Sequence, residues 1–105
     1  MIRKQKDALP RSFKGVTFDL LAVGQRSMVT KMKYKTGDNV PSHSHPNEQS
    51  GYVISGKYEI GIDEAKDLIE QGDSYSIPAD MAHSWRVIEP GEVIDVFTPI
   101  REDYL

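Results

Sequence analysis

The sequence of 105 residues contains no cysteine, only three histidines and a single tryptophan. The lack of cysteine excludes disulfide bonds, thiolate metal ligands and a thiol nucleophile. Any bound metal ion must therefore be held by nitrogen and oxygen donors. The chain also has no net basic charge, because its formal charge is −3 at pH 7. This acidic balance argues against a nucleic-acid partner.

No apolar run approaches the roughly 20 residues that cross a membrane. The amino terminus reads Met-Ile-Arg-Lys-Gln-Lys-Asp and lacks the apolar core of a secretion signal. We therefore expect a soluble, cytoplasmic protein without a membrane partner. The length predicts one domain with an ordinary hydrophobic core.

Apolar and polar residues alternate with the period of β-strands along most of the chain. Residues 16–23 are rich in strand formers, and residues 28–35 alternate methionine, threonine and tyrosine with valine and lysine. Further strands are predicted at 51–54, 57–63, 68–70, 75–77, 84–88 and 93–98. Turns of glycine, proline and aspartate separate them, and no segment has the period of an amphipathic helix. The pattern predicts an all-β fold, an antiparallel sandwich or small barrel.

The amino-terminal residues 1–12 are polar and include four basic side chains. We expect them to form a solvated arm ahead of a barrel core at about 16–99. An arm that adds a strand to a neighbouring subunit remains open as the alternative. Residues 63–67 read Asp-Glu-Ala-Lys-Asp and are expected to form a polar turn.

The histidines fall in two segments punctuated by glycine and proline. His43 and His45 are two residues apart, and residues i and i+2 of a strand point to the same face. This spacing aims two imidazoles at one point, as a bound cation requires. Gln49 follows with an amide oxygen that can be another ligand, and Glu48 beside it is the rival donor. His83 lies in the second segment, which could meet the first across a small β-structure.

The choice between Gln49 and Glu48 matters for the chemistry. The spacing favours Gln49, since Glu48 would coordinate only after a slip of one residue. With Gln49 every protein ligand is neutral, so a divalent ion keeps its full charge and is a strong Lewis acid. Such a site lacks the carboxylate of many iron oxygenases, which argues against redox chemistry. Nitrogen and oxygen ligands admit Ni, Zn, Mn, Fe or Cu. The alternative is a set of partly buried imidazoles without a metal.

A second polar group lies near the carboxyl terminus. Asp95 interrupts an apolar strand, and Phe97 shares its face. A charge in such a strand is costly unless it is paired or performs chemistry. Asp95 could accept a proton beside the metal, with Phe97 as an apolar wall and Arg101 binding a substrate carboxylate through two hydrogen bonds. The alternatives are an Asp95–Arg101 structural pair and an Asp95 that faces solvent on an edge strand.

The two histidine segments resemble the paired motifs of the cupin family. The first motif is Gly, five residues, His-X-His, three or four residues, Glu, six residues, Gly. The matching residues are Gly37, His43, His45, Gln49 (where the family usually has Glu) and Gly56. The second motif is Gly, five residues, Pro-X-Gly, two residues, His, three residues, Asn. Gly72, Pro78 and His83 match it, while Asp80 and Val87 depart from it. The resemblance implies a single cupin domain over residues 1–105, a jelly-roll-like antiparallel barrel.

Two further runs narrow the resemblance within that family. They are Pro-Ser-His-Ser-His-Pro-X-Glu-Gln-X-Gly-Tyr-Val and Asp-Val-Phe-X-Pro-X-Arg-X-Asp-Tyr-Leu. They look like the small cupins of pectin and alginate breakdown, which open the ring of 4,5-unsaturated monouronates to linear keto sugars. The metal ligands implied are His43, His45, Gln49 and His83. The active-site residues implied are Asp95, Phe97 and Arg101.

The resemblance also implies one divalent metal ion, a small anionic sugar as substrate, and a homodimer. Two other functions remain open: a metal-dependent dioxygenase of the quercetinase-like type, and a non-catalytic cupin that binds a sugar or a metal. Trp85 shares strand parity with His83, so it either stacks on a sugar ring or belongs to the core, the commoner place for a lone tryptophan. Tyr52 has the opposite parity to Gln49, which favours the other face of its sheet.

Overall fold

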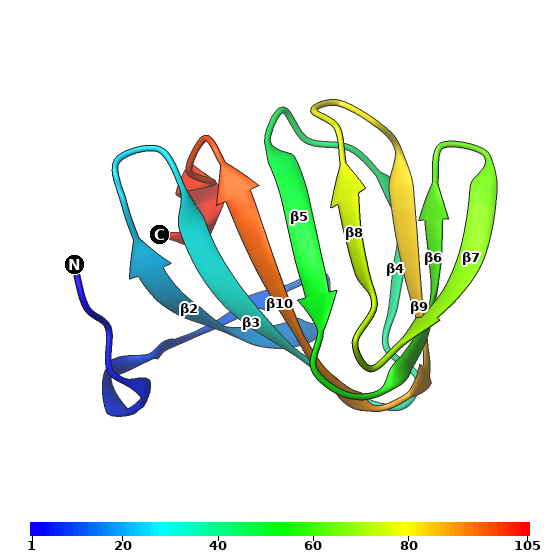
Figure 1. The fold of residues 1–105 in the computed structure, drawn as a ribbon, viewed down its shortest axis with the longest axis horizontal. Helices are drawn as coiled ribbons and strands as arrows, with labels where there is room; N and C mark the ends of the chain where they lie inside the picture. The colour runs from blue at the N-terminus through cyan, green and yellow to red at the C-terminus, as the bar shows by residue number, and fades with distance from the viewer.

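The computed structural model describes residues 1–105 as two antiparallel β-sheets, without an α-helix (Figure 1). The larger sheet has six strands in the order β1-β2-β3-β10-β5-β8, and the smaller has four in the order β4-β9-β6-β7. The bounds of the larger sheet are β1 Leu9–Phe13, β2 Val16–Val23, β3 Met28–Tyr34, β10 Gly91–Thr98, β5 Glu48–Val53 and β8 Ser74–Ile77. Those of the smaller are β4 Asn39–His43, β9 His83–Glu89, β6 Lys57–Ile62 and β7 Ala65–Glu70. Two short 3-10 helices, η1 Gln5–Asp7 and η2 Glu102–Tyr104, complete the chain.

The core lies between the two sheets and is built from alternate residues of each strand. On β3 the buried residues are Met28, Thr30, Met32 and Tyr34, as the alternating pattern predicts. Seventeen buried apolar residues form one cluster. On β5 the side chain of Tyr52 points outward and is 51% exposed, which confirms its predicted face. The all-β prediction is confirmed, and most strand bounds agree with it to within one or two residues.

The amino-terminal region differs from the prediction of a solvated arm. Residues 9–12 lie in β1, which pairs antiparallel with β2 at the edge of the larger sheet. Leu9 and Phe13 pack against the core, so the segment has an apolar side that its mostly polar composition did not predict. Pro10 is tolerated because an edge strand leaves one row of N–H groups unpaired. The strand is added to the chain's own sheet.

The segment predicted as a polar turn at 63–67 is also shorter than expected. β7 begins at Ala65 and pairs with all of β6, from Lys57 to Ile62. Only Ile69 of β7 is buried, so backbone pairing holds this edge strand and its side chains carry almost no apolar signal. The turn is limited to Asp63 and Glu64, and Asp63 adopts a positive φ of 56°. Aspartate tolerates this left-handed conformation better than most residues.

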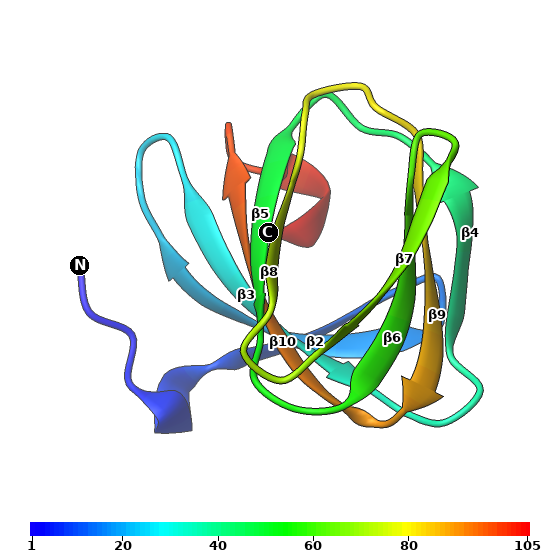
Figure 2. The ribbon, with the colours of Figure 1, turned by 45° about the vertical axis from the view of Figure 1, so that its right-hand side comes forward.

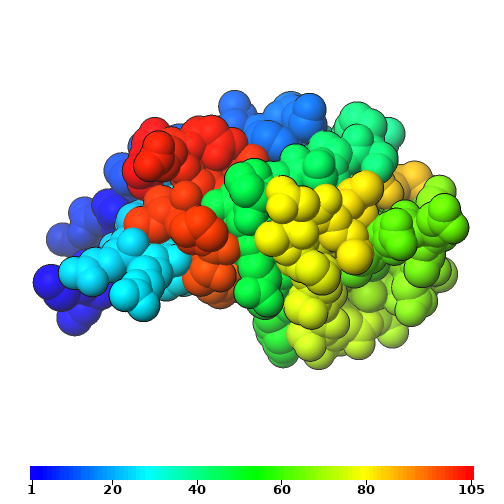
Figure 3. All heavy atoms as spheres, turned by 90° about the horizontal axis from the view of Figure 1, so that it is seen from above, coloured from blue at the N-terminus to red at the C-terminus, as the bar shows by residue number.

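The two sheets form a cup whose opening lies near the carboxyl terminus. In the rotated view of Figure 2, β5 and β8 stand opposite β4, β9 and β6, with the carboxyl-terminal η2 at the rim. Seen from above in Figure 3, the carboxyl-terminal residues (red) border the green segment that joins β4 to β5. The side-chain amide of Asn47 in that segment donates to the Pro99 carbonyl at 2.7 Å. No helix has the length and apolar character needed to span a membrane.

Candidate functional site

The three histidines come together at the opening of the cup. His43 ends β4 and His83 begins β9, and the two residues are paired in register across these neighbouring strands. His45 follows in the segment that leads to β5. The ring centroid of His83 lies 4.3 Å from that of His43 and 4.8 Å from that of His45. One nitrogen of each imidazole lies within 4.8 Å of the others, so the cluster could hold a metal ion.

Backbone carbonyls fix which nitrogen of each imidazole is free. Nδ1 of His43 lies 3.0 Å from the carbonyl oxygen of Pro41, and Nδ1 of His83 lies 2.9 Å from that of Met81. Nδ1 of His45 lies 2.9 Å from the Asn47 carbonyl oxygen. A carbonyl can only accept, so each Nδ1 carries the proton. Each Nε2 is then left with a lone pair, as in histidines oriented for metal binding.

Gln49 joins the histidines from the opposite sheet. Its side chain is buried on the inner face of β5, whereas Glu48 is exposed, so the strand shows no one-residue slip. The side-chain Oε1 of Gln49 lies 3.1 Å from Nε2 of His45. With Nδ1 protonated, both atoms are acceptors, and neither can donate to the other. Two acceptors at this distance are the arrangement expected of neighbouring ligands of one cation with bonds of about 2.1 Å. The donor set fits a divalent metal.

Burial keeps the imidazoles neutral. Desolvation lowers the pKa of His83 to about 4, and the positive charges of the other two imidazoles and of Arg101 push in the same direction. The pKa values of His43 and His45 are also lowered, again mainly by burial. Backbone hydrogen bonds at Nδ1 oppose these shifts only in part. At neutral pH all three side chains are uncharged, which is the form that binds a metal.

Asp95 lies deeper in the cup, on the inner face of β10. Its side chain is only 2% exposed, and burial raises its pKa to about 6. Hydrogen bonding from Tyr75 and Gln49 and the charge of Arg101 pull the pKa in the opposite direction. Phe97 is buried on the same face and packs edge-on against His45, with ring centroids 5.8 Å apart. The predicted shared face of these two residues is confirmed, and a solvent-facing Asp95 is excluded.

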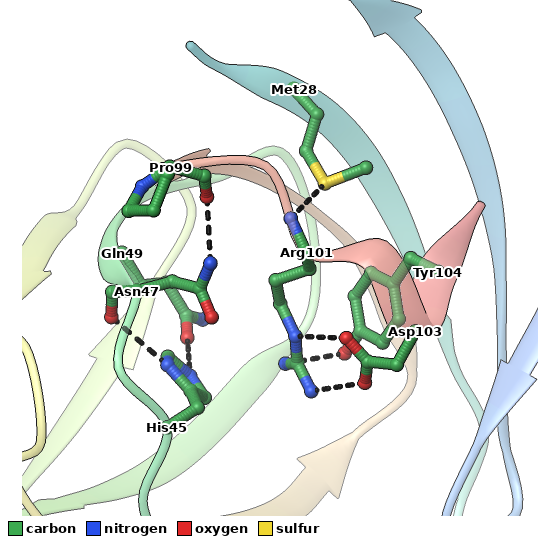
Figure 4. A network of polar contacts seen from close by, with 8 residues as sticks. All are labelled: Met28, His45, Asn47, Gln49, Pro99, Arg101, Asp103 and Tyr104. Atoms are coloured by element: carbon green, nitrogen blue, oxygen red, sulfur yellow. Dashed lines mark hydrogen bonds and ion pairs between the residues drawn. The ribbon is translucent and has the colours of Figure 1, made fainter.

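Arg101 is buried at the rim of the cup and is held by its neighbours in the chain (Figure 4). Its Nε and Nη2 donate to the two carboxylate oxygens of Asp103 at 3.2 and 2.8 Å. Its Nη1 donates to the Tyr104 hydroxyl at 2.9 Å. The guanidinium carbon lies 4.0 Å from the Tyr104 ring centroid and 5.2 Å from that of Phe97. The ion pair of Arg101 is therefore with Asp103, so the alternative of an Asp95–Arg101 pair is wrong.

One cavity gathers these groups between the two sheets. Among its lining residues are His43, Gln49, His83, Asp95, Phe97 and Arg101. His45 lines an adjoining groove at the rim together with Asn47 and Arg101. Trp85 also lines the cavity, and its ring stacks on Tyr34 with centroids 5.2 Å apart. It therefore belongs to the core and to the pocket wall at once.

Sequence reasoning missed several residues that build the site. Tyr75 donates a hydrogen bond from its hydroxyl to Oδ1 of Asp95. Asn47 ties the His45 segment to Pro99, two residues before Arg101 (Figure 4). Tyr75 and Ile77 alternate with Ser74 and Ser76, and this pattern predicts that the side chain of Tyr75 points inward. No comparable signal marks Asn47, because its role depends on two segments that are distant in sequence.

Comparisons with known proteins agree with this architecture. Residues 30–97 match the model of the Cupin_2 family, described as a cupin domain. The chain is 28% identical over 93 residues to the pectin degradation protein KdgF of Dickeya dadantii (strain 3937), which covers 87% of this chain and 84% of that protein.

Two solved structures are similar over nearly the whole chain. An RmlC-like cupin from Shewanella frigidimarina NCIMB 400 has a TM-score of 0.91 at 24% identity, covering 99% of this chain and 95% of that one. KdgF from Halomonas sp. has a TM-score of 0.88 at 25% identity, covering 98% and 96%. Because the family model matches more than half of the chain, the protein belongs to the Cupin_2 family.

Proposed function

We propose that the protein opens the ring of 4,5-unsaturated monouronates released from pectin or alginate, with the help of one divalent metal ion. The main support for the proposal is that Asp95, whose pKa is raised to about 6, and a cluster of neutral imidazoles lie at the same cavity. The similarity to two proteins named KdgF, one of them described as a pectin degradation protein, supports the substrate class.

The proposed metal ligands are Nε2 of His43, His45 and His83 and Oε1 of Gln49. The Nδ1–H groups of the three histidines already donate to backbone carbonyls, so the free Nε2 atoms need no rearrangement before metal binding. When bound, the ion supplies Lewis acidity toward substrate oxygens. Because all four ligands are uncharged, that acidity is not reduced by an anionic ligand. The ligands leave the metal open among Ni, Zn, Mn, Fe and Cu.

Arg101 is the proposed carboxylate-binding residue. Asp103 and Tyr104 engage three of its N–H groups, one on each nitrogen. A guanidinium has five N–H donors, so one remains on each terminal nitrogen. These two donors can bind a uronate carboxylate while the existing bonds hold the side chain in place. The aromatic rings around it restrict its motion and lower the entropy lost on binding.

Asp95 is the proposed proton carrier. In the reaction it accepts the proton of the hemiacetal hydroxyl at C1, a carbonyl forms at C1 as the bond between C1 and the ring oxygen breaks, and the ring oxygen leaves as the enolate oxygen on C5. Asp95 then returns the proton to C4, which converts the enolate to a ketone and conserves all atoms. A pKa of about 6 lets the same carboxyl accept and donate near neutral pH. Phe97 closes one side of the cavity against water.

An absorbance assay tests this proposal directly. The substrate is the monouronate mixture from exhaustive lyase digestion of pectate or alginate, whose conjugated double bond absorbs in the ultraviolet. Metal-loaded protein should remove this absorbance faster than the spontaneous reaction, equally well without oxygen. A dioxygenase would instead consume oxygen with a flavonol or diketone, and a binding protein would be stabilised by the uronate without turnover. Either of these results, together with an unchanged absorbance, would overturn the proposal.

A further inference from the structure

Three residues on neighbouring strands lie in one row on the inner face of the larger sheet. Asp95 of β10 is paired in register with Gly51 of β5, and Gly51 is paired with Tyr75 of β8. Gly51 therefore lies between the carboxylate and the tyrosine. Even so, the hydroxyl of Tyr75 reaches Asp95 and donates a hydrogen bond to Oδ1. The contact crosses a whole strand.

The absence of a side chain at Gly51 makes this crossing possible. A Cβ at that position would overlap with Cζ and the hydroxyl oxygen of Tyr75, and it would lie 2.6 Å from Oδ1 of Asp95. The φ of Gly51 is not in the left-handed region, so backbone conformation gives no reason for a glycine here. Space for the hydroxyl of Tyr75 is the remaining physical reason. Any larger residue would displace the ring or the carboxylate.

The hydrogen bond also restricts the carboxylate. A buried Asp side chain can rotate about its last torsion, which has broad, roughly two-fold preferences. A donor fixed at Oδ1 selects one orientation of the carboxylate. Tyr75 is itself held in place, because its ring packs against Trp85 with centroids 5.4 Å apart. The acceptor and its donor therefore both have defined positions.

We propose that Tyr75 is a positioning residue that orients the Asp95 carboxylate for proton transfer, and that Gly51 supplies the space through which it acts. This inference rests on the proposed function of Asp95. Tyr75 makes no hydrogen bond to the three imidazoles, although its hydroxyl is also hydrogen-bonded to Gln49, the fourth proposed ligand. Its removal should affect the chemical step and leave substrate binding unchanged, and the three imidazoles should keep the metal bound.

The first test compares Tyr75→Phe with Tyr52→Phe. Tyr52 lies on the adjacent strand β5 and points to the outer face, so it is a matched control. In Tyr75→Phe we expect kcat to fall about tenfold, KM to stay within about twofold, and the metal content to be unchanged. Tyr52→Phe should match the wild type in all three. An unchanged kcat in Tyr75→Phe, with an active wild type, would overturn the inference and leave the proposed function intact.

The second test repeats Tyr75→Phe in an Asp95→Asn background. If Tyr75 acts through Asp95, the substitution should change the residual kcat by less than about twofold once the carboxylate is gone. An equal tenfold loss in both backgrounds would mean that Tyr75 acts independently, and the inference would be wrong. If the metal-loaded wild type does not process the uronate at all, the proposed function fails, a result distinct from both outcomes above.

Discussion

The two sheets form the two walls of the cup, and burial has opposite effects on the pKa values of their ionisable groups. On the smaller sheet, burial lowers the pKa of His83 to about 4 and so disfavours its positively charged form. On the larger sheet, burial raises the pKa of Asp95 to about 6 and so disfavours its negatively charged form. The hydrogen-bond partners differ as well. Backbone carbonyls hold the imidazoles, whereas a side-chain hydroxyl from Tyr75 holds the carboxylate.

The two proposed roles, metal binding and proton transfer, draw on the same apolar environment. Desolvation penalises whichever form is charged. For an imidazole the neutral form is the metal ligand, so burial favours binding at once. For a carboxyl group the same penalty brings the pKa near the working pH, which suits proton transfer. Substitutions in the two sheets should therefore impair different properties of the protein.

Removing an imidazole from the smaller sheet should have the largest effect. We expect His83→Ala to lose bound metal and, with it, turnover down to the spontaneous rate, because one of the proposed ligands is gone. Metal analysis of the purified protein and the uronate assay measure the two losses. Ser84→Ala, at the next position and lining the groove on the outer face, is the control and should keep both. Full metal content in His83→Ala would remove His83 from the ligand set.

Removing the carboxylate from the larger sheet should spare the metal. We expect Asp95→Asn to lower kcat by about 10²–10⁴-fold, the usual contribution of general acid–base catalysis, with metal content unchanged. Metal analysis beside steady-state kinetics separates this result from that of His83→Ala. The two walls would not be functionally distinct if Asp95→Asn lost metal as well.

Arg101 at the rim should show a smaller effect, expressed in binding. We expect Arg101→Lys to raise KM about tenfold with little change in kcat, since lysine offers a point charge where arginine forms two parallel hydrogen bonds. Arg86→Lys on the outer face, where Arg86 pairs with the partly exposed Glu59, is the matched control. A fall in kcat without a change in KM would assign Arg101 to the chemical step.

The pH dependence of stability should show the two walls acting against each other in metal-free protein. An imidazole with a lowered folded-state pKa binds its proton more readily when unfolded, so stability should fall as the pH drops from 6.5 toward the value of about 4 for His83. Asp95 acts in the opposite sense between about 6 and 3.8, because its folded form binds the proton more tightly. Urea midpoints at several pH values measure the net effect.

Two variants test this opposition. In Asp95→Asn the loss of stability on acidification should be steeper than in the wild type, because the opposing group is absent. In His83→Gln it should be shallower, because one of the imidazoles that resist protonation is absent. Identical pH profiles for the three proteins would contradict the assigned pKa shifts.

Local pattern was enough to predict most of the fold and the candidate residues. The alternation of 28–34 predicted the inner face of β3. The spacing from His45 to Gln49 predicted an amide beside the imidazoles, and Oε1 of Gln49 lies 3.1 Å from Nε2 of His45. Features fixed by long-range pairing were not predictable. β7 is held by its backbone partner β6, and its side chains give little indication of a strand.

The contacts of the charged groups could not be predicted from the sequence either. The ion-pair partner of Arg101 is Asp103, two positions away in a 3-10 helix that the periodicity of the sequence did not predict. Tyr75, one of the hydrogen-bond partners of Asp95, becomes its neighbour only because β5 pairs with both β8 and β10 and has a glycine between them. Register across three strands decides that contact, and register is set by the whole sheet.

The proposed metal site is tested most directly by a crystal structure of the metal-loaded protein with anomalous scattering recorded at the absorption edge of its ion. We predict a single strong anomalous peak within bonding distance of Nε2 of His43, His45 and His83 and of Oε1 of Gln49. A peak elsewhere in the loaded protein, or Nε2 atoms that bind no ion, would rule out this ligand set.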